Sequence, residues 1–151
     1  MRLTQLTDYA LRMLIHLGQH PQRLCTIGEI AVRYGVSEPH LMKVAHLLGR
    51  AGWIAATRGR GGGLRLARPP REIRLGAVVR GMEPDLFIVE CFSGASTCAL
   101  TGACRLTGVM DGALRSFIAH LDAHTLADIV PPPAEPAGQV IGLPSRWRKA
   151  A

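Results

Sequence analysis

The sequence lacks any uninterrupted run of eighteen apolar residues, about the length that a membrane-spanning helix needs. Its N-terminal segment carries Asp8 and Arg12 where a secretory signal peptide would have its apolar region. We therefore expect a cytoplasmic protein. Thiols stay reduced in that compartment, so a cluster of cysteines indicates metal binding or redox sensing more often than a disulfide framework.

Catalytic patterns are also missing. The chain has no paired carboxylates, no nucleophile with an adjacent base and no cofactor-binding loop, so we do not expect an enzyme. Its glycine-rich stretch, residues 59–63, is not followed by the lysine and hydroxyl residue of a phosphate-binding loop. The next segment also predicts a strand, whereas a phosphate-binding loop leads into a helix.

Acidic residues are scarce in the N-terminal half. Residues 1–70 contain ten Lys or Arg and three Asp or Glu, whereas residues 71–151 contain eight of each sign. The whole formal net charge of +7 therefore belongs to the first half of the chain. A charge that served only solubility would be spread more evenly, so this asymmetry favours a nucleic acid as partner.

Two helices around a glycine follow an amphipathic helix predicted over residues 3–18. The first of the two, residues 26–34, begins with Thr26 and Glu29 at capping-box spacing. The second is capped by Ser37 and runs to about residue 50. This is the helix-turn-helix arrangement, whose second helix enters the major groove of DNA by its N-terminal end. The exposed residues expected there are Ser37, Pro39, His40 and Lys43.

A hairpin is predicted directly after these helices. Residues 53–57 and 64–67 have strand patterns, and the glycine-rich turn between them carries Arg58 and Arg60. A hairpin in this place is the wing of a winged helix-turn-helix. Its arginines are suited to a narrow minor groove, so the expected fold is mainly α with a small β-hairpin wing.

A long apolar helix is predicted from Arg105 onward. We expect it to pair with its twin in a homodimer, which would supply two recognition helices, although packing on its own domain stays an alternative. Its apolar positions are Leu106, Met110, Ala113, Leu114, Phe117, Ile118 and Leu121. The chain then divides into a DNA-binding region (1–70), a connecting helix with a cysteine loop (71–104), a dimerisation helix with a short terminal helix (105–130) and a flexible tail (131–151).

Three of the four cysteines, Cys91, Cys98 and Cys104, lie within fourteen residues in a stretch rich in small and turn-forming residues. Thiolates are the ligands that zinc and iron-sulfur clusters select. The gaps of six and five residues differ from the two-residue spacing usual for structural zinc. An iron-sulfur cluster is therefore favoured over zinc or a disulfide. Cys25 lies far away and is expected to be a small buried hydrophobe.

Several short motifs occur in order along residues 1–130: Leu3-Thr4, Thr7-Asp8-Tyr9, Tyr34-Gly35-Val36-Ser37, Arg50-Ala51-Gly52, the wing from Arg58 to Leu66, Glu83-Pro84, Cys104-Arg105-Leu106 and Thr125-Leu126-Ala127-Asp128. With them the chain resembles the winged-helix iron-sulfur transcriptional repressors of the IscR/NsrR superfamily, and within it the nitric-oxide-sensing NsrR group. The cluster-assembly regulators of that superfamily have a histidine where this chain has Thr107, whereas Asp8 matches the NsrR-type pattern.

This resemblance implies a dimeric repressor that releases its operator when nitric oxide nitrosylates the cluster. It also makes Asp8 from one subunit a candidate fourth ligand, beside the three loop cysteines, to the cluster held by the other subunit. Three cysteines and one carboxylate favour a 4Fe-4S over a 2Fe-2S cluster. The alternatives are a zinc- or thiol-based redox-sensing repressor of the same fold, or a small iron-sulfur redox protein.

Overall fold

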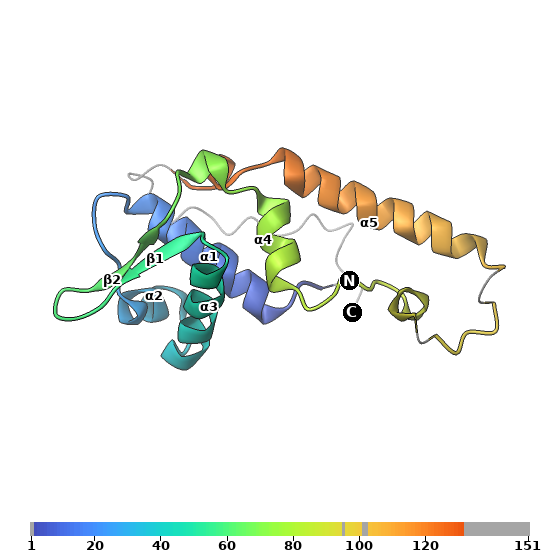
Figure 1. Ribbon diagram of the computed structural model, residues 1–151, viewed down its shortest axis with the longest axis horizontal. Helices are drawn as coiled ribbons and strands as arrows, with labels where there is room; N and C mark the ends of the chain where they lie inside the picture. Colours follow the sequence, from blue (N-terminus) through green and yellow to red (C-terminus); the bar gives the residue numbers. More distant parts are fainter. Residues whose placement is uncertain (1, 95, 101–102, 132–151) are drawn as a thin grey trace, which may run out of the picture.

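The computed structural model describes residues 2–94, 96–100 and 103–131 (Figure 1). It is mainly helical and has one two-stranded antiparallel hairpin among the described residues, so the predicted fold class is confirmed. The elements, in chain order, are α1 (Gln5–Gln19), α2 (Ile27–Tyr34), α3 (Glu38–Arg50), β1 (Ile54–Thr57), β2 (Gly63–Leu66), η1 (Pro70–Glu72), α4 (Leu75–Met82), η2 (Glu90–Ser93), α5 (Arg105–Ala123) and η3 (Leu126–Asp128). No helix in the described ranges is long and apolar enough to span a membrane.

Helix α1 forms the centre of the core. Thr4 caps it by accepting a hydrogen bond from the backbone N–H of Thr7, as the sequence predicts. Met13 and Leu14 are fully buried on its inner face. The helix was predicted over residues 3–18, and it begins two residues later and ends one residue later than that. Gly18 lies against Val130, where an added Cβ would sit 2.6 Å from a methyl carbon.

The helix-turn-helix has the expected bounds. Both halves of the Thr26–Glu29 capping box are formed, and Gly35 ends α2 with a φ of 64°. Ser37 occupies the N-cap position of α3, but its side chain makes no capping hydrogen bond. Its hydroxyl lies 2.9 Å from Nδ1 of His40 instead. The position was therefore predicted correctly and the side-chain interaction was not.

The wing is an antiparallel pair in which Ile54 faces Leu66 and Thr57 faces Gly63. Strand β1 begins one residue later than predicted and ends where predicted, whereas β2 begins and ends one residue earlier than predicted. The backbone of Cys25 also pairs with Leu64, through hydrogen bonds of 2.9 and 2.8 Å. The loop between α1 and α2 thus holds one side of the wing.

Helix α5 extends away from the body of the molecule, and its C-terminal part contacts α4 (Figure 1). Arg80 and Asp122 join the two helices through two hydrogen bonds of 2.8 Å. The short terminal helix predicted over residues 125–130 is a 3₁₀ turn, and its Leu126 is fully buried in the core. Most of the predicted tail, residues 132–151, lies outside the described residues.

Candidate nucleic-acid interface and metal centre

The N-terminal part of α3 is exposed. Its opposite side packs into the core through Leu41, Val44 and Leu48, which are all buried. Met42, 55% exposed, and the exposed His46 also lie outside the core and were not singled out from the sequence. The helical period could have placed them, because neither belongs to the buried stripe. The predicted DNA-contacting residues Ser37, Pro39, His40 and Lys43 are all exposed.

The turn of the wing carries the two other predicted DNA contacts. Arg58 and Arg60 are exposed, on a hairpin that projects beyond the helices (Figure 1). Gly59 and Gly61, with φ angles of 96° and 78°, give the turn a backbone conformation that residues with a side chain rarely adopt. The cationic side chains are therefore placed at the tip of a projecting element.

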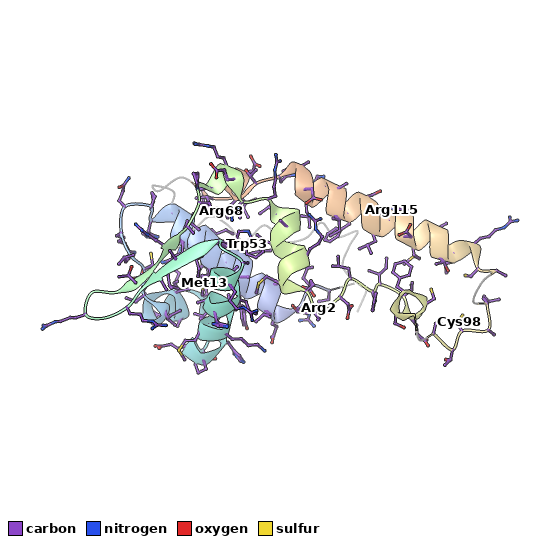
Figure 2. All side chains as sticks on the ribbon, viewed as in Figure 1. Arg2, Met13, Trp53, Arg68, Cys98 and Arg115 are labelled. Atoms are coloured by element: carbon purple, nitrogen blue, oxygen red, sulfur yellow. The ribbon has the colours of Figure 1, made fainter. Side chains whose placement is uncertain are left out.

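The three loop cysteines lie at the end of the molecule away from the core, as Figure 2 shows for Cys98 relative to Met13. No disulfide joins them. Cys91 lies in the 3₁₀ helix η2, so this part is more ordered than the open loop expected, and Cys104 is the N-cap residue of α5. Cys91 and Cys104 are half-buried and Cys98 is exposed.

Thr107 connects two of these cysteines. Its hydroxyl lies 3.7 Å from Sγ of Cys91. The same hydroxyl, and then the backbone N–H groups of Thr107 and Leu106, lower the pKa of the Cys104 thiol. A lower pKa favours the thiolate, which is the form that binds metals. The first turn of α5 therefore supports two of the three thiols.

The sulfurs of the loop are not gathered into a compact ligand set. Among the described residues, the group of three ligand side chains whose donor atoms lie within 4.8 Å of one another is His16, His20 and Cys25. If the loop is to bind a cluster, Cys98 must therefore move toward Cys91 and Cys104, the two cysteines next to Thr107. The expectation that Cys25 is buried is confirmed, and burial raises the pKa of its thiol to about 11.

Asp8 lies on α1, one turn after its N-terminus, with 47% of its side chain exposed. Its carboxylate pairs with Arg12 at 2.9 Å. It is therefore on the surface of its own subunit, outside the apolar stripe of the helix.

Glu83 links the N-terminus of α1 to the end of α4, and sequence reasoning missed it. Its carboxylate accepts hydrogen bonds from the backbone N–H of Thr4 at 2.9 Å, from the hydroxyl of Thr4 at 3.1 Å and from the hydroxyl of the buried Thr7. From Glu83 the chain runs directly toward the cysteine loop. The Glu83-Pro84 pair was visible in the sequence, but nothing local indicated a partner about eighty residues away.

Comparison with known proteins identifies transcriptional regulators as relatives of this chain. Residues 3–132 match the Rrf2 family, described as iron-dependent transcriptional regulators. The chain is 47% identical over 132 residues to the HTH-type transcriptional regulator NsrR of Geobacillus kaustophilus, and 46% identical over 132 residues to NsrR of Bacillus subtilis. Each alignment covers 86% of this chain and 90% of the relative.

Solved structures of similar fold include the IscR of T. potens, with a TM-score of 0.69 and 28% identity over 85% of both chains. The cysteine regulator CymR of B. subtilis has a TM-score of 0.72 and 23% identity, over 86% of this chain and 96% of that one, and supports the fold alone. The relatives are regulators, which counts against a small iron-sulfur redox protein. The chain belongs to the Rrf2 family of iron-dependent transcriptional regulators, and is a repressor of the IscR/NsrR type.

Proposed function

We propose that this protein is a cytoplasmic, homodimeric repressor whose iron-sulfur cluster senses nitric oxide. The observation that carries the proposal is the position of Thr107, which lies against Cys91 and lowers the pKa of Cys104. Two thiols thus converge on the first turn of α5, and Cys98 lies on the loop that joins them. When bound, the cluster supplies the iron that nitric oxide attacks.

The fourth ligand of the cluster is proposed to come from the partner subunit. Thr107, which stands where related cluster-assembly regulators have a histidine, is a poor iron ligand, so the loop itself offers three thiolates. Asp8 is partly exposed, and within the described part of the chain its carboxylate is held by an exposed ion pair with Arg12. Such a pair contributes roughly 0.3–0.5 kcal/mol, so its loss is a small cost beside a metal bond. Three thiolates and one carboxylate favour 4Fe-4S over 2Fe-2S.

Helix α5 is proposed to form the dimer interface. No residue of α5 is buried within the subunit, and Leu106 and Val109 are 59% and 67% exposed. An apolar stripe none of whose residues is fully buried, along a helix of nineteen residues, is typical of a surface that pairs with a second copy. This pairing would bring a partner's α1 within reach of the loop.

We propose that loss of the Asp8 ligand changes DNA binding by shifting helix α1. Helix α1 packs against α3, and Glu83 ties the N-terminus of α1 to the segment that leads to the cysteines. A shift of α1 would therefore change the separation of the two recognition helices and reduce operator affinity.

The first prediction tests this function directly. Anaerobically purified protein is expected to be brown and to bind operator DNA, and nitric oxide is expected to bleach it and weaken DNA binding at least about ten-fold, a loss of roughly 1.4 kcal/mol. Visible absorbance and fluorescence anisotropy measure the two effects in one sample.

A colourless protein that contains zinc and does not respond to nitric oxide would instead support the second candidate, a zinc- or thiol-based repressor. The exposed Cys98, and the hydrogen bonds from Thr107 that lower the pKa of Cys104, favour that candidate over others.

The second prediction concerns the DNA contacts. Lys43→Ala is expected to weaken binding about three- to ten-fold and to lower the salt-dependence slope by about 1, because one phosphate or base-edge contact is lost. Arg60→Ala is expected to reduce affinity mainly for operators with AT-rich flanks, whose minor groove is narrow. Arg71→Ala is the control, since this exposed arginine lies on η1, outside α3, the wing and the proposed dimer interface. Equal affinity of all three variants and the unaltered protein would contradict the assignment.

A further inference from the structure

A second set of metal-binding side chains lies at the C-terminal end of α1, outside the cysteine loop. His16 and His20 are one helical turn apart on α1, and Cys25 follows in the loop before α2. One donor atom from each lies within 4.8 Å of the other two. His16 is 6% exposed, Cys25 is fully buried and His20 is half-buried, so the group lies at the edge of the core.

Hydrogen bonds leave one ring nitrogen of each histidine available. Nε2 of His16 lies 3.0 Å from the carboxylate of Glu29, which can only accept, so Nε2 carries the proton and Nδ1 has the lone pair. Nδ1 of His20 lies 2.8 Å from the backbone oxygen of His16, so Nε2 of His20 has the lone pair. Metal-binding histidines usually have this arrangement, in which a carboxylate or carbonyl oxygen fixes the other nitrogen.

Nδ1 of His16 is the observation that points to a ligand. It is buried and has no hydrogen-bond partner among the described residues. An unsatisfied buried polar atom costs on the order of 1–3 kcal/mol, so a native protein usually supplies it with a partner such as an ordered water or an ion. The hydrogen bond to Glu29 is made by the other ring nitrogen, Nε2, and therefore does not satisfy Nδ1.

We propose that His16, His20 and Cys25 bind one zinc ion, with Glu29 orienting His16. Two imidazoles and one thiolate suit zinc, which is tetrahedral and borderline-soft, and water can fill the fourth position. Tetrahedral zinc needs donor atoms roughly 3.3–3.7 Å apart, closer than the 4.8 Å within which a donor atom of each side chain lies, so the side chains must close around the ion on binding. Binding exchanges the proton of the Cys25 thiol for the metal, and releases one proton to solvent for each ion bound.

Glu29 is fitted to this supporting role. Arg23 pairs with its two carboxylate oxygens at 2.8 and 3.0 Å, which fixes the group that accepts the hydrogen bond from the imidazole of His16. The site also has a structural connection to DNA binding, because the backbone of Cys25 pairs with Leu64 in β2. A bound ion would thus join α1 to the wing and stabilise both.

The test uses the full chain with the three loop cysteines replaced by serine, which removes the other thiol ligands. Cobalt(II), a spectroscopic substitute for zinc, is titrated into metal-free protein under anaerobic conditions. One cobalt per subunit is expected, with a sulfur-to-cobalt charge-transfer band that zinc abolishes. One proton should be released per ion, and zinc should raise the melting temperature, because it binds only the folded state.

The control is a histidine pair of the same local geometry. His120 on α5 and His124, the C-cap residue of α5, have their rings 4.6 Å apart, as His16 and His20 do, and Nδ1 of His124 also lies 2.8 Å from the preceding histidine's backbone oxygen. That pair is not grouped with a cysteine among the described residues. His124→Gln should therefore leave cobalt binding unchanged, whereas His20→Gln should weaken it at least about ten-fold.

Cys25→Ala should remove the charge-transfer band altogether. Since Cys25 is buried, circular dichroism checks that this variant folds. If it does not fold, the His20→Gln variant, which changes a half-buried residue, tests the proposal instead. No thiolate band in the triple-serine protein, or equal affinity in the His20→Gln and His124→Gln variants, would overturn the proposal. Neither result depends on the iron-sulfur cluster or on nitric oxide.

Discussion

Heterodimers made of one Asp8→Ala subunit and one Cys104→Ser subunit are expected to hold one nitric-oxide-responsive cluster, about half the content of the unaltered dimer. The Asp8→Ala subunit keeps its cysteines and receives Asp8 from its partner. The Cys104→Ser subunit lacks a thiolate ligand and should hold no stable cluster. Two different affinity tags allow purification of the heterodimer, and iron, sulfide and visible absorbance give its cluster content.

The two homodimers, Cys104→Ser and Asp8→Ala, are the reference samples with which the heterodimer is compared. Cys104→Ser homodimers should lose the cluster and about 100-fold or more in operator affinity, if the cluster is required for the DNA-binding arrangement. Asp8→Ala homodimers should have an unstable cluster with an altered response. Arg12→Ala, which removes the ion-pair partner of Asp8 and no proposed ligand, should behave like the unaltered protein. If the heterodimer behaves like the Asp8→Ala homodimer, Asp8 does not act across the interface.

Gly76→Ala is expected to destabilise the fold by about 1–3 kcal/mol, because α5 lies too close to α4 for a methyl group. The added Cβ would overlap the carboxylate of Asp122 and lie 3.0 Å from its backbone nitrogen. The carboxylate could rotate away only by giving up its two hydrogen bonds to Arg80, and the backbone nitrogen could move only with the helix. The melting temperature should fall by roughly 3–10 °C.

Gly49→Ala is the matched control for this substitution. Gly49 lies within α3, outside the proposed dimer interface, and an added Cβ would meet nothing within 4 Å. Alanine is favoured over glycine in a helix by about 1 kcal/mol, so this variant should be as stable as the unaltered protein or more so. Thermal unfolding followed by circular dichroism compares the two. Equal melting temperatures would show that α4 and α5 can separate without cost.

Much of the fold follows from local chemistry that can be read along the chain. Thr4, Thr26 and Gly35 predict helix ends because a hydroxyl cap or a left-handed glycine acts within a few residues. The wing follows from two short apolar segments around a glycine turn. The cysteine loop stands out through spacing alone. Each of these signals depends only on residues that are neighbours in the sequence, so it can be recognised without the structure.

The site was predictable in its residue types and less so in its geometry. The sequence indicates three thiols and, through resemblance, Asp8. It does not indicate that Thr107 lies beside Cys91 while Cys98 is exposed. That depends on how η2 folds back toward the first turn of α5, which is decided by contacts across the loop.

The sequence by itself therefore determined the winged helix-turn-helix, the basic N-terminal half and the thiol-rich loop, because caps, periodicity and charge are local properties. Only the tertiary structure showed that Gly18 and Gly76 are packing positions, that Glu83 holds the start of α1, and that Cys25 lies beside two histidines. These features join residues distant in sequence or on different elements. Their partners are selected by the packing of the whole chain, and a local pattern carries no record of that packing.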